Sequence, residues 1–169
     1  MRTIKLLVLV LMFGFGVKAI AAIFIQSPSS CTSTTWMNCQ NSFSSNDVRS
    51  LGAAPASGVW GDYNFNFGTT TSTSTASTTV QIGVEAKASS CLNSAQMSVA
   101  ISKNGGASYG TDHSLTLTCA ESTNWVDVTA DFPSWSTSDF SNSNLKVRAK
   151  CDQGSYCKLD WLPVEVDIP

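Results

Sequence analysis

Short runs of alternating apolar and polar residues dominate this sequence after its first 21 residues, where no long segment has a helical period. Side chains of a β-strand point alternately to its two faces, so each run predicts a strand with one buried face. The predicted strands lie near residues 63–67, 80–86, 97–101, 115–117, 125–128, 145–149 and 159–168. Runs this short, bounded by turn residues, predict an all-β fold, an antiparallel β-sandwich of jelly-roll type.

Two short segments predict connections between strands. Asn104 and Gly105 form an Asn-Gly pair, which tolerates the positive φ of a tight turn. Ser136 and Asp139 have nearly the spacing of a capping box, which predicts a single helical turn.

The first 21 residues have the pattern of a signal peptide. Arg2 and Lys5 give a positive start, and residues 6–17 are apolar and uncharged. Residues 19–21 read Ala-Ile-Ala, a small-x-small pattern, so we expect cleavage before Ala22. The apolar run is too short to span a bilayer as a helix.

Cleavage would leave residues 22–169 as a single domain with seven basic and twelve acidic residues, a net charge near −5. Nucleic-acid binding depends on lysine and arginine, so this surface predicts no nucleic-acid partner and no affinity for anionic membranes. The alternative is an uncleaved anchor over residues 4–25, which would place Lys18 inside the apolar span. We therefore expect a secreted or cell-surface protein without membrane association after cleavage.

The cysteines agree with export. All six follow the predicted cleavage site, none forms a CxxC motif, and the chain has one histidine, so zinc and other metal sites are not expected. In an oxidising compartment six such residues predict three disulfides. Six cysteines can pair in many ways, and loop positions suggest Cys31 with Cys39, Cys151 with Cys157 across a hairpin, and Cys91 with Cys119.

Several segments together resemble a β-sandwich module of archaeal and bacterial secreted and cell-surface proteins. They are Trp36-Met37-Asn38, Asn46-Asp47-Val48, Gly58-Val59-Trp60, Tyr63-Asn64-Phe65, Ile82–Ala86, Ile101–Gly106, Trp135–Phe140, Asn144–Arg148 and Leu159–Val166. The resemblance implies an extracellular structural or surface module without catalysis and offers no catalytic residues to carry over. The chain is also similar in plan to subunits of archaeal extracellular filaments. It departs from the module in its added cysteines and single-domain length.

The mature N-terminus suggests how such a module could assemble. Ala22, Ile23, Phe24, Ile25 and Gln26 form a short, apolar, β-prone segment at a free end. One interpretation is the first strand of the chain's own sheet. The other is a donor strand that joins the open edge of the next subunit, which would give a self-assembling filament or sheath.

A secreted adhesin or carbohydrate-binding module is the alternative function, because sugars stack on exposed aromatic rings. The candidate rings are Trp36, Trp60, Tyr63, Tyr109, Trp125, Trp135 and Tyr156. Trp60 and Trp161 are expected in the core, and Tyr109 and Tyr156, beside glycines, on the surface. Three coplanar exposed rings would favour sugar binding, and a bare surface with an unpaired sheet edge would favour assembly.

Catalysis is not expected, and neither is a cofactor. Asp127 with Asp131, or Asp160 with Glu165, could form the carboxylate pair of a glycosidase. The second pair differs in strand parity, so on one straight strand its members would point to opposite faces. The only histidine, His113, is expected in a solvated loop. A weaker possibility is a Ca²⁺ site formed by Asp127, Asp131 or Asp112.

Overall fold

The computed structural model of this protein describes residues 22–32, 36–52, 59–67, 78–141, 143–154 and 156–168. The expected signal peptide lies outside these residues. The strands are β1 (Ala22–Gln26), β2 (Pro28–Thr32), β3 (Trp36–Met37), β4 (Ser50–Gly52), β5 (Gly61–Phe65), β6 (Thr79–Ala88), β7 (Ala95–Ser102), β8 (His113–Leu117), β9 (Ser122–Asp127), β10 (Lys146–Gly154), β11 (Cys157–Trp161) and β12 (Val164–Ile168). Three 3₁₀ turns connect them: η1 (Cys39–Ser42), η2 (Thr129–Asp131) and η3 (Thr137–Phe140).

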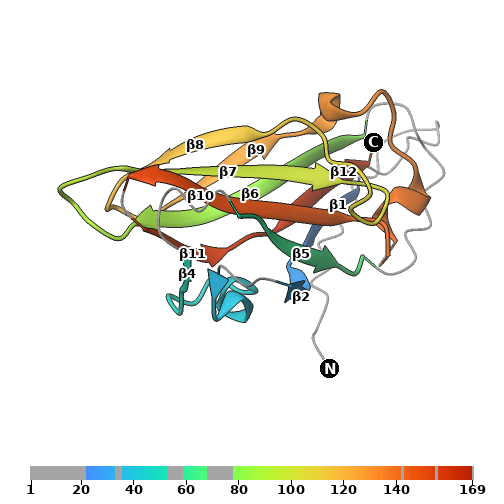
Figure 1. Ribbon diagram of the computed structural model, residues 1–169. Helices are drawn as coiled ribbons and strands as arrows, with labels where there is room; N and C mark the ends of the chain where they lie inside the picture. Colours follow the sequence, from blue (N-terminus) through green and yellow to red (C-terminus); the bar gives the residue numbers. More distant parts are fainter. Residues whose placement is uncertain are drawn as a thin grey trace, which may run out of the picture.

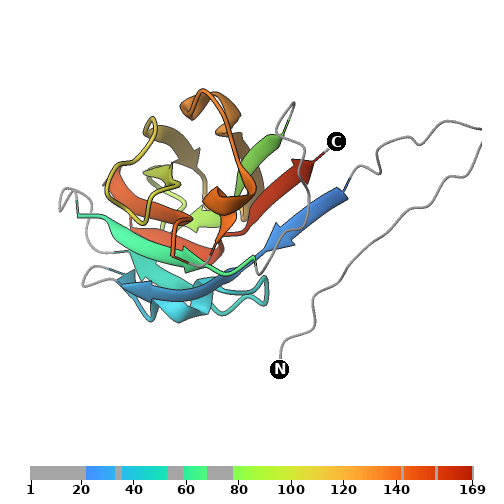
Figure 2. The same ribbon diagram turned by 90° about the vertical axis from the view of Figure 1, so that its right-hand side faces the viewer.

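The strands form two antiparallel sheets that pack face to face, which confirms the predicted all-β sandwich (Figure 1). Sheet A has seven strands in the order β1-β12-β6-β11-β4-β3, with β9 also paired to β6. Sheet B has five strands in the order β2-β5-β10-β7-β8. The chain passes from the edge of sheet A to the edge of sheet B between β1 and β2 (Figure 2). No helix among the described residues is long and apolar enough to cross a membrane.

Strand β6 organises sheet A. It pairs with β9 along one side, and with β12 and then β11 along the other. The predicted single strand over residues 159–168 is therefore two strands. The break lies at Leu162 and Pro163, where the Gly83 backbone N–H donates to the Pro163 carbonyl at 2.8 Å. Proline has no N–H to donate to a ladder, which accounts for the interruption.

The core lies between the sheets and follows the alternation in the sequence. In β6 the inward side chains of Val80, Ile82, Val84 and Ala86 are at most 1% exposed. In β10 the apolar Val147 and Ala149 are buried, and the basic Lys146, Arg148 and Lys150, which alternate with them, face outward. Because paired residues share a face of a sheet, this alternation fixes which side chains can reach solvent.

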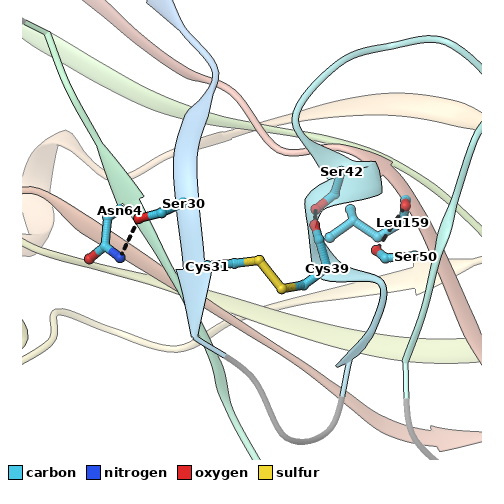
Figure 3. Close-up of a disulfide and its surroundings, with 7 residues drawn as sticks. All are labelled: Ser30, Cys31, Cys39, Ser42, Ser50, Asn64 and Leu159. Atoms are coloured by element: carbon cyan, nitrogen blue, oxygen red, sulfur yellow. Dashed lines mark hydrogen bonds between the residues drawn. A yellow bond between two sulfur atoms is a disulfide. The ribbon is translucent and has the colours of Figure 1, made fainter.

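Three disulfides are present, as predicted, and they join the pairs that the loop positions suggested: Cys31–Cys39, Cys91–Cys119 and Cys151–Cys157. The hairpin expected around Cys151–Cys157 is wrong, because β10 belongs to sheet B and β11 to sheet A. This disulfide therefore links the two layers. The bond from Cys31 in β2 to Cys39 in η1 ties the edge of sheet B to the turn that leads into sheet A (Figure 3).

Both predicted connections are confirmed. Gly105 and Gly106 have φ values of 74° and 89°, the positive values that an Asn-Gly turn requires. Ser136 caps η3 in a complete capping box: its backbone N–H donates to the Asp139 carboxylate at 2.7 Å.

Candidate binding face

The structure divides the candidate aromatic rings into three groups. Trp36, Tyr63 and Trp135 are at most 3% exposed and belong to the core. Trp125 and Tyr156 are exposed, at 41% and 46%. The remaining candidates, Trp60 and Tyr109, are half-buried, and so is Trp161, which was expected in the core.

Two exposure predictions are therefore wrong. Trp60 and Trp161 are half-buried and lie outside the core. Trp161 pairs with the outward-facing Glu85, and Trp60, just before β5, lies against Arg148 and Lys150 of β10. Tyr109 is half-buried: the Arg148 guanidinium lies over its ring, and its hydroxyl donates to the Asp62 carboxylate at 2.9 Å. Tyr156 is exposed as predicted. Among the seven candidate rings only Trp125 and Tyr156 are exposed, so the three exposed rings set as the criterion for a sugar platform are not present.

The outer face of sheet A carries the most exposed tryptophan, and strand register defines its neighbours. Trp125 in β9 lies directly opposite Gly83 in β6, and Gly83 is bonded in turn to Pro163. These three residues, which we call the Trp125 platform, form one row across the sheet.

Gly83 makes room for this row. A Cβ atom at Gly83 would lie 2.6 Å from Cγ of Pro163 and 2.9 Å from Cζ3 of Trp125. The far edge of the indole and the proline ring therefore meet above a residue that has no side chain. Glycine in a central strand weakens pairing and often marks a close approach to the backbone. Here it lets an indole reach across the sheet surface and remain open to solvent.

Polar side chains border the platform. Gln81 and Glu85 lie two residues before and after Gly83 in β6, and Thr123 in β9 is paired with Glu85. None of these three side chains bonds to a described residue. Asp127, paired with Gln81, accepts hydrogen bonds from the hydroxyl and backbone N–H of Thr129, which lower the pKa of Asp127. The border thus supplies free amide, carboxylate and hydroxyl groups around an exposed ring.

Trp161 lies on the same face, in the next row. It pairs with Glu85, and its indole N–H donates to the Ser27 hydroxyl at 2.9 Å. From standard strand spacing, its backbone is about 10 Å from that of Trp125 across the strands. The half-buried ring extends the apolar surface beyond the Trp125 platform.

The outer face of sheet B has rings of a different kind. The Arg148 guanidinium lies between Trp60 and Tyr109, 4.1 and 4.3 Å from their ring centres. Lys150 also lies over Trp60, at 4.6 Å. Each ring therefore has a face covered by a cation of its own chain, in the geometry of cation–π contacts.

Carboxylates hold this stack in place. Arg148 donates to Asp112 at 2.7 Å, and Lys150 pairs with Asp152 at 2.9 Å. Burial and the bond to Asp62 raise the pKa of Tyr109, so its hydroxyl stays protonated. The predicted wet, basic face of β10 is thus largely neutralised by acidic neighbours.

The acids of the two candidate pairs have separate partners or environments in the structure. Asp131 is bound to His113, whose Nε2 lies 3.0 Å from Oδ1, so His113 at the start of β8 is not the predicted solvated loop residue. Asp127 is engaged by Thr129 and does not join Asp131 in a calcium site. Asp160 is 1% exposed, whereas Glu165 is on the outer face of β12.

Asp160 instead anchors a loop. Its Oδ2 accepts the backbone N–H groups of Asn46 and Asp47, both at 3.1 Å. Asp47 and Glu121 have carboxylate oxygens within 4.8 Å of it, and Arg49 bonds to both of those residues. The hydrogen bond from Arg49 lowers the pKa of Glu121. With an arginine already between the acids, the cluster is an ion-pair network.

The predicted donor segment is β1, the outermost strand of sheet A. It pairs antiparallel with β12 over all five residues, from Ala22 with Ile168 to Gln26 with Val164. The segment is therefore the first strand of the chain's own sheet, which was one of its two interpretations. Its Ile23 and Ile25 side chains remain 55% and 51% exposed, on the same face as Glu165. Exchange of this strand between subunits stays a prediction.

Comparison with known proteins adds little to this geometry. No protein-family model matches the chain, and no curated protein matches it. One solved structure, described as "CBM4 structure and function", is similar at 13% identity over 86% of each chain, with a TM-score of 0.38. A likeness of this degree carries no argument about function.

Proposed function

We propose that this protein is an extracellular carbohydrate-binding module that holds glycans on the Trp125 platform. The observation that carries the proposal is an indole 41% exposed on the outer face of sheet A, positioned over a glycine that leaves it space. Exposing so large a ring to water is unfavourable unless a ligand covers it. The faces of pyranose rings carry C–H groups that pack on indoles.

The border of the platform fits the rest of a sugar. Gln81, Glu85 and Thr123 offer donors and acceptors that are not engaged within the chain, and sugar hydroxyls can use both. Such sites combine an apolar surface with a few placed polar groups. The nearby acids Glu85, Asp127 and Glu165 would repel a polyuronate. We therefore expect neutral polysaccharides as ligands.

The extracellular location rests on the disulfides. Three of them close in the structure, and such bonds are rare in cytosolic proteins. Of the three platform residues, Trp125 is exposed to solvent, whereas Gly83 and Pro163 are buried. An exported binding domain would meet glycans outside the cell.

A binding experiment tests the proposal. Purified protein would be incubated with insoluble neutral polysaccharides, and the bound fraction would be compared with that of Trp125→Ala and Tyr156→Ala. Loss of a central anchor ring costs about 2 kcal/mol or more, so Trp125→Ala should weaken binding about thirtyfold. Tyr156, equally exposed but in the β10–β11 connection, is the matched control and should bind normally. Equal binding by all three proteins would rule the platform out.

Assembly by strand addition is the second candidate function. The observation that favours it is the position of β1 at a sheet edge, with two exposed isoleucines and no charge. In this scheme β1 would leave its own β12 and complete sheet A of the next copy, which generates a filament. Deletion of residues 22–26 followed by electron microscopy tests it. Fibres formed by the wild-type protein and lost on deletion would support it, and fibres that persist would exclude it.

A further inference from the structure

We infer that the outer edge of β1 is a pairing surface for a second copy of this chain, and that two copies join β1 to β1, antiparallel, across a two-fold axis. The strand stays on its own β12 and adds a neighbour on its free side. This differs from strand addition, in which β1 would leave β12. Sheet A would then run continuously through both copies.

The edge strands of the two sheets differ in their protection against pairing, and β1 is the least protected. Edge strands normally carry protection against pairing, such as proline, bulges, charges or short length. Strand β2 begins with Pro28 and has a register shift after it, and β3 has only two residues. The exposed residues of β8 are Ser114 and Thr116, and β9 ends in Asp127. Only β1 among the described edges is five residues long, free of proline and of charged side chains, and aliphatic where exposed.

The strand is self-complementary about Phe24. In an antiparallel pair centred there, Ile23 of one copy faces Ile25 of the other, twice, on the outer face of the sheet. Paired residues share a face, so these four exposed side chains would cover one another. The two Phe24 rings would meet on the inner face, where each already packs partly against the core.

Charge does not oppose this pairing. The acids closest to the edge on this face, Glu165 and Asp167, lie one strand inward, on β12. Their counterparts in the second copy would be three strand spacings away, about 14 Å. That exceeds the Debye length of about 8 Å at physiological ionic strength, so the repulsion is largely screened. A pairing limited to five residues buries little surface, so we expect a weak, concentration-dependent dimer.

The arrangement has a consequence that rests on the proposed glycan function. A two-fold axis perpendicular to the sheet puts both outer faces on the same side. Two Trp125 platforms would then face one surface, and binding to a polymer could gain from two linked contacts.

Sedimentation velocity of the secreted protein over a concentration series, without glycan, tests the pairing independently of sugar binding. We expect the sedimentation coefficient to rise from a monomer value and level off at a dimer. Ile25→Lys places a charge on the edge and should keep the protein monomeric. Val48→Lys, at an equally exposed valine outside the strands, is the matched control and should dimerise normally.

Three outcomes would overturn the inference. The first is a monomer at every concentration. The second is growth beyond two copies, which would indicate strand addition, because edge-to-edge pairing uses the free edge of β1 once. The third is a dimer that Ile25→Lys leaves intact. Circular dichroism of both variants verifies that they fold.

Discussion

The close approach above Gly83 gives the sharpest prediction for the platform. In Gly83→Ala the new Cβ would lie 2.6 Å from Cγ of Pro163, about 1 Å closer than carbon atoms normally pack. Pro163 cannot easily withdraw, because its carbonyl is bonded to the Gly83 backbone N–H. Trp125 is free on its outer side, so the indole should be pushed off the sheet.

The expected magnitude follows from two opposing effects. Overpacking by one methyl group costs typically 1–3 kcal/mol, roughly, and replacing glycine by alanine recovers about 0.4–1 kcal/mol through the unfolded state. We therefore expect Gly83→Ala to lower the free energy of unfolding by about 1–2 kcal/mol, measured by urea denaturation. Glycan binding should fall together with stability, because the indole of Trp125 would leave its position.

A matched variant separates the two effects. Trp125→Ala removes one of the two clashing groups, so Gly83→Ala should cost less stability in that background than in the wild-type chain. A double-mutant cycle measures the difference as a coupling free energy. If Gly83→Ala is as stable as wild type and binds glycan normally, the platform geometry argued from Gly83, Pro163 and Trp125 is wrong.

Three further predictions concern stability away from the platform. Arg49→Gln should lower the free energy of unfolding by about 1 kcal/mol at neutral pH. Arg49 lowers the pKa of Glu121 in the folded state, so its stabilising contribution is present above the ordinary carboxyl pKa and is lost as the pH falls through the pKa of Glu121 in the folded protein. The free energies of unfolding of the two proteins, measured by urea titration across that pH range, should therefore converge in acid. Asp160→Ala leaves two backbone N–H groups without acceptors and should cost about 2–4 kcal/mol in the same assay, and an unchanged midpoint would refute its anchoring role. Replacing Cys151 and Cys157 together by serine opens a loop with a sequence separation of 6 and should cost about 2 kcal/mol in thermal unfolding, whereas no change would mean that this bond does not constrain the sheets.

The fold was predictable because the alternation in the sequence reports burial directly. Val80, Ile82 and Val84 face the core as their spacing indicates, and β6 extends to both sides of them. The break at Pro163 was not predicted, because a residue period does not reveal where a strand changes partners. The same limit made Cys151 and Cys157 look like a hairpin: loop length suggests proximity and says nothing about which sheet each strand joins.

The candidate site was only partly predictable. Trp125 was one of seven candidate rings, and nothing in the sequence distinguished it. Its exposure depends on lying opposite Gly83 across two strands that are about forty residues apart in the chain, and only register reveals that pairing. Likewise, the cation that covers Trp60 comes from Arg148, far along the chain. A glycine inside the alternating run of β6 was the available signal, since it marks a close approach to the backbone.

We propose that glycans bind on the outer face of sheet A through Trp125. The most direct measurement is nuclear magnetic resonance of the indole N–H groups of the tryptophans during titration with a neutral oligosaccharide. We expect the Trp125 signal to shift progressively and saturate, while those of the buried Trp36 and Trp135 stay in place. An unmoved Trp125 signal with a saturating shift at Trp60 would place the site on sheet B and refute binding at Trp125. The absence of any shift across neutral oligosaccharides of different composition would refute the proposed glycan function.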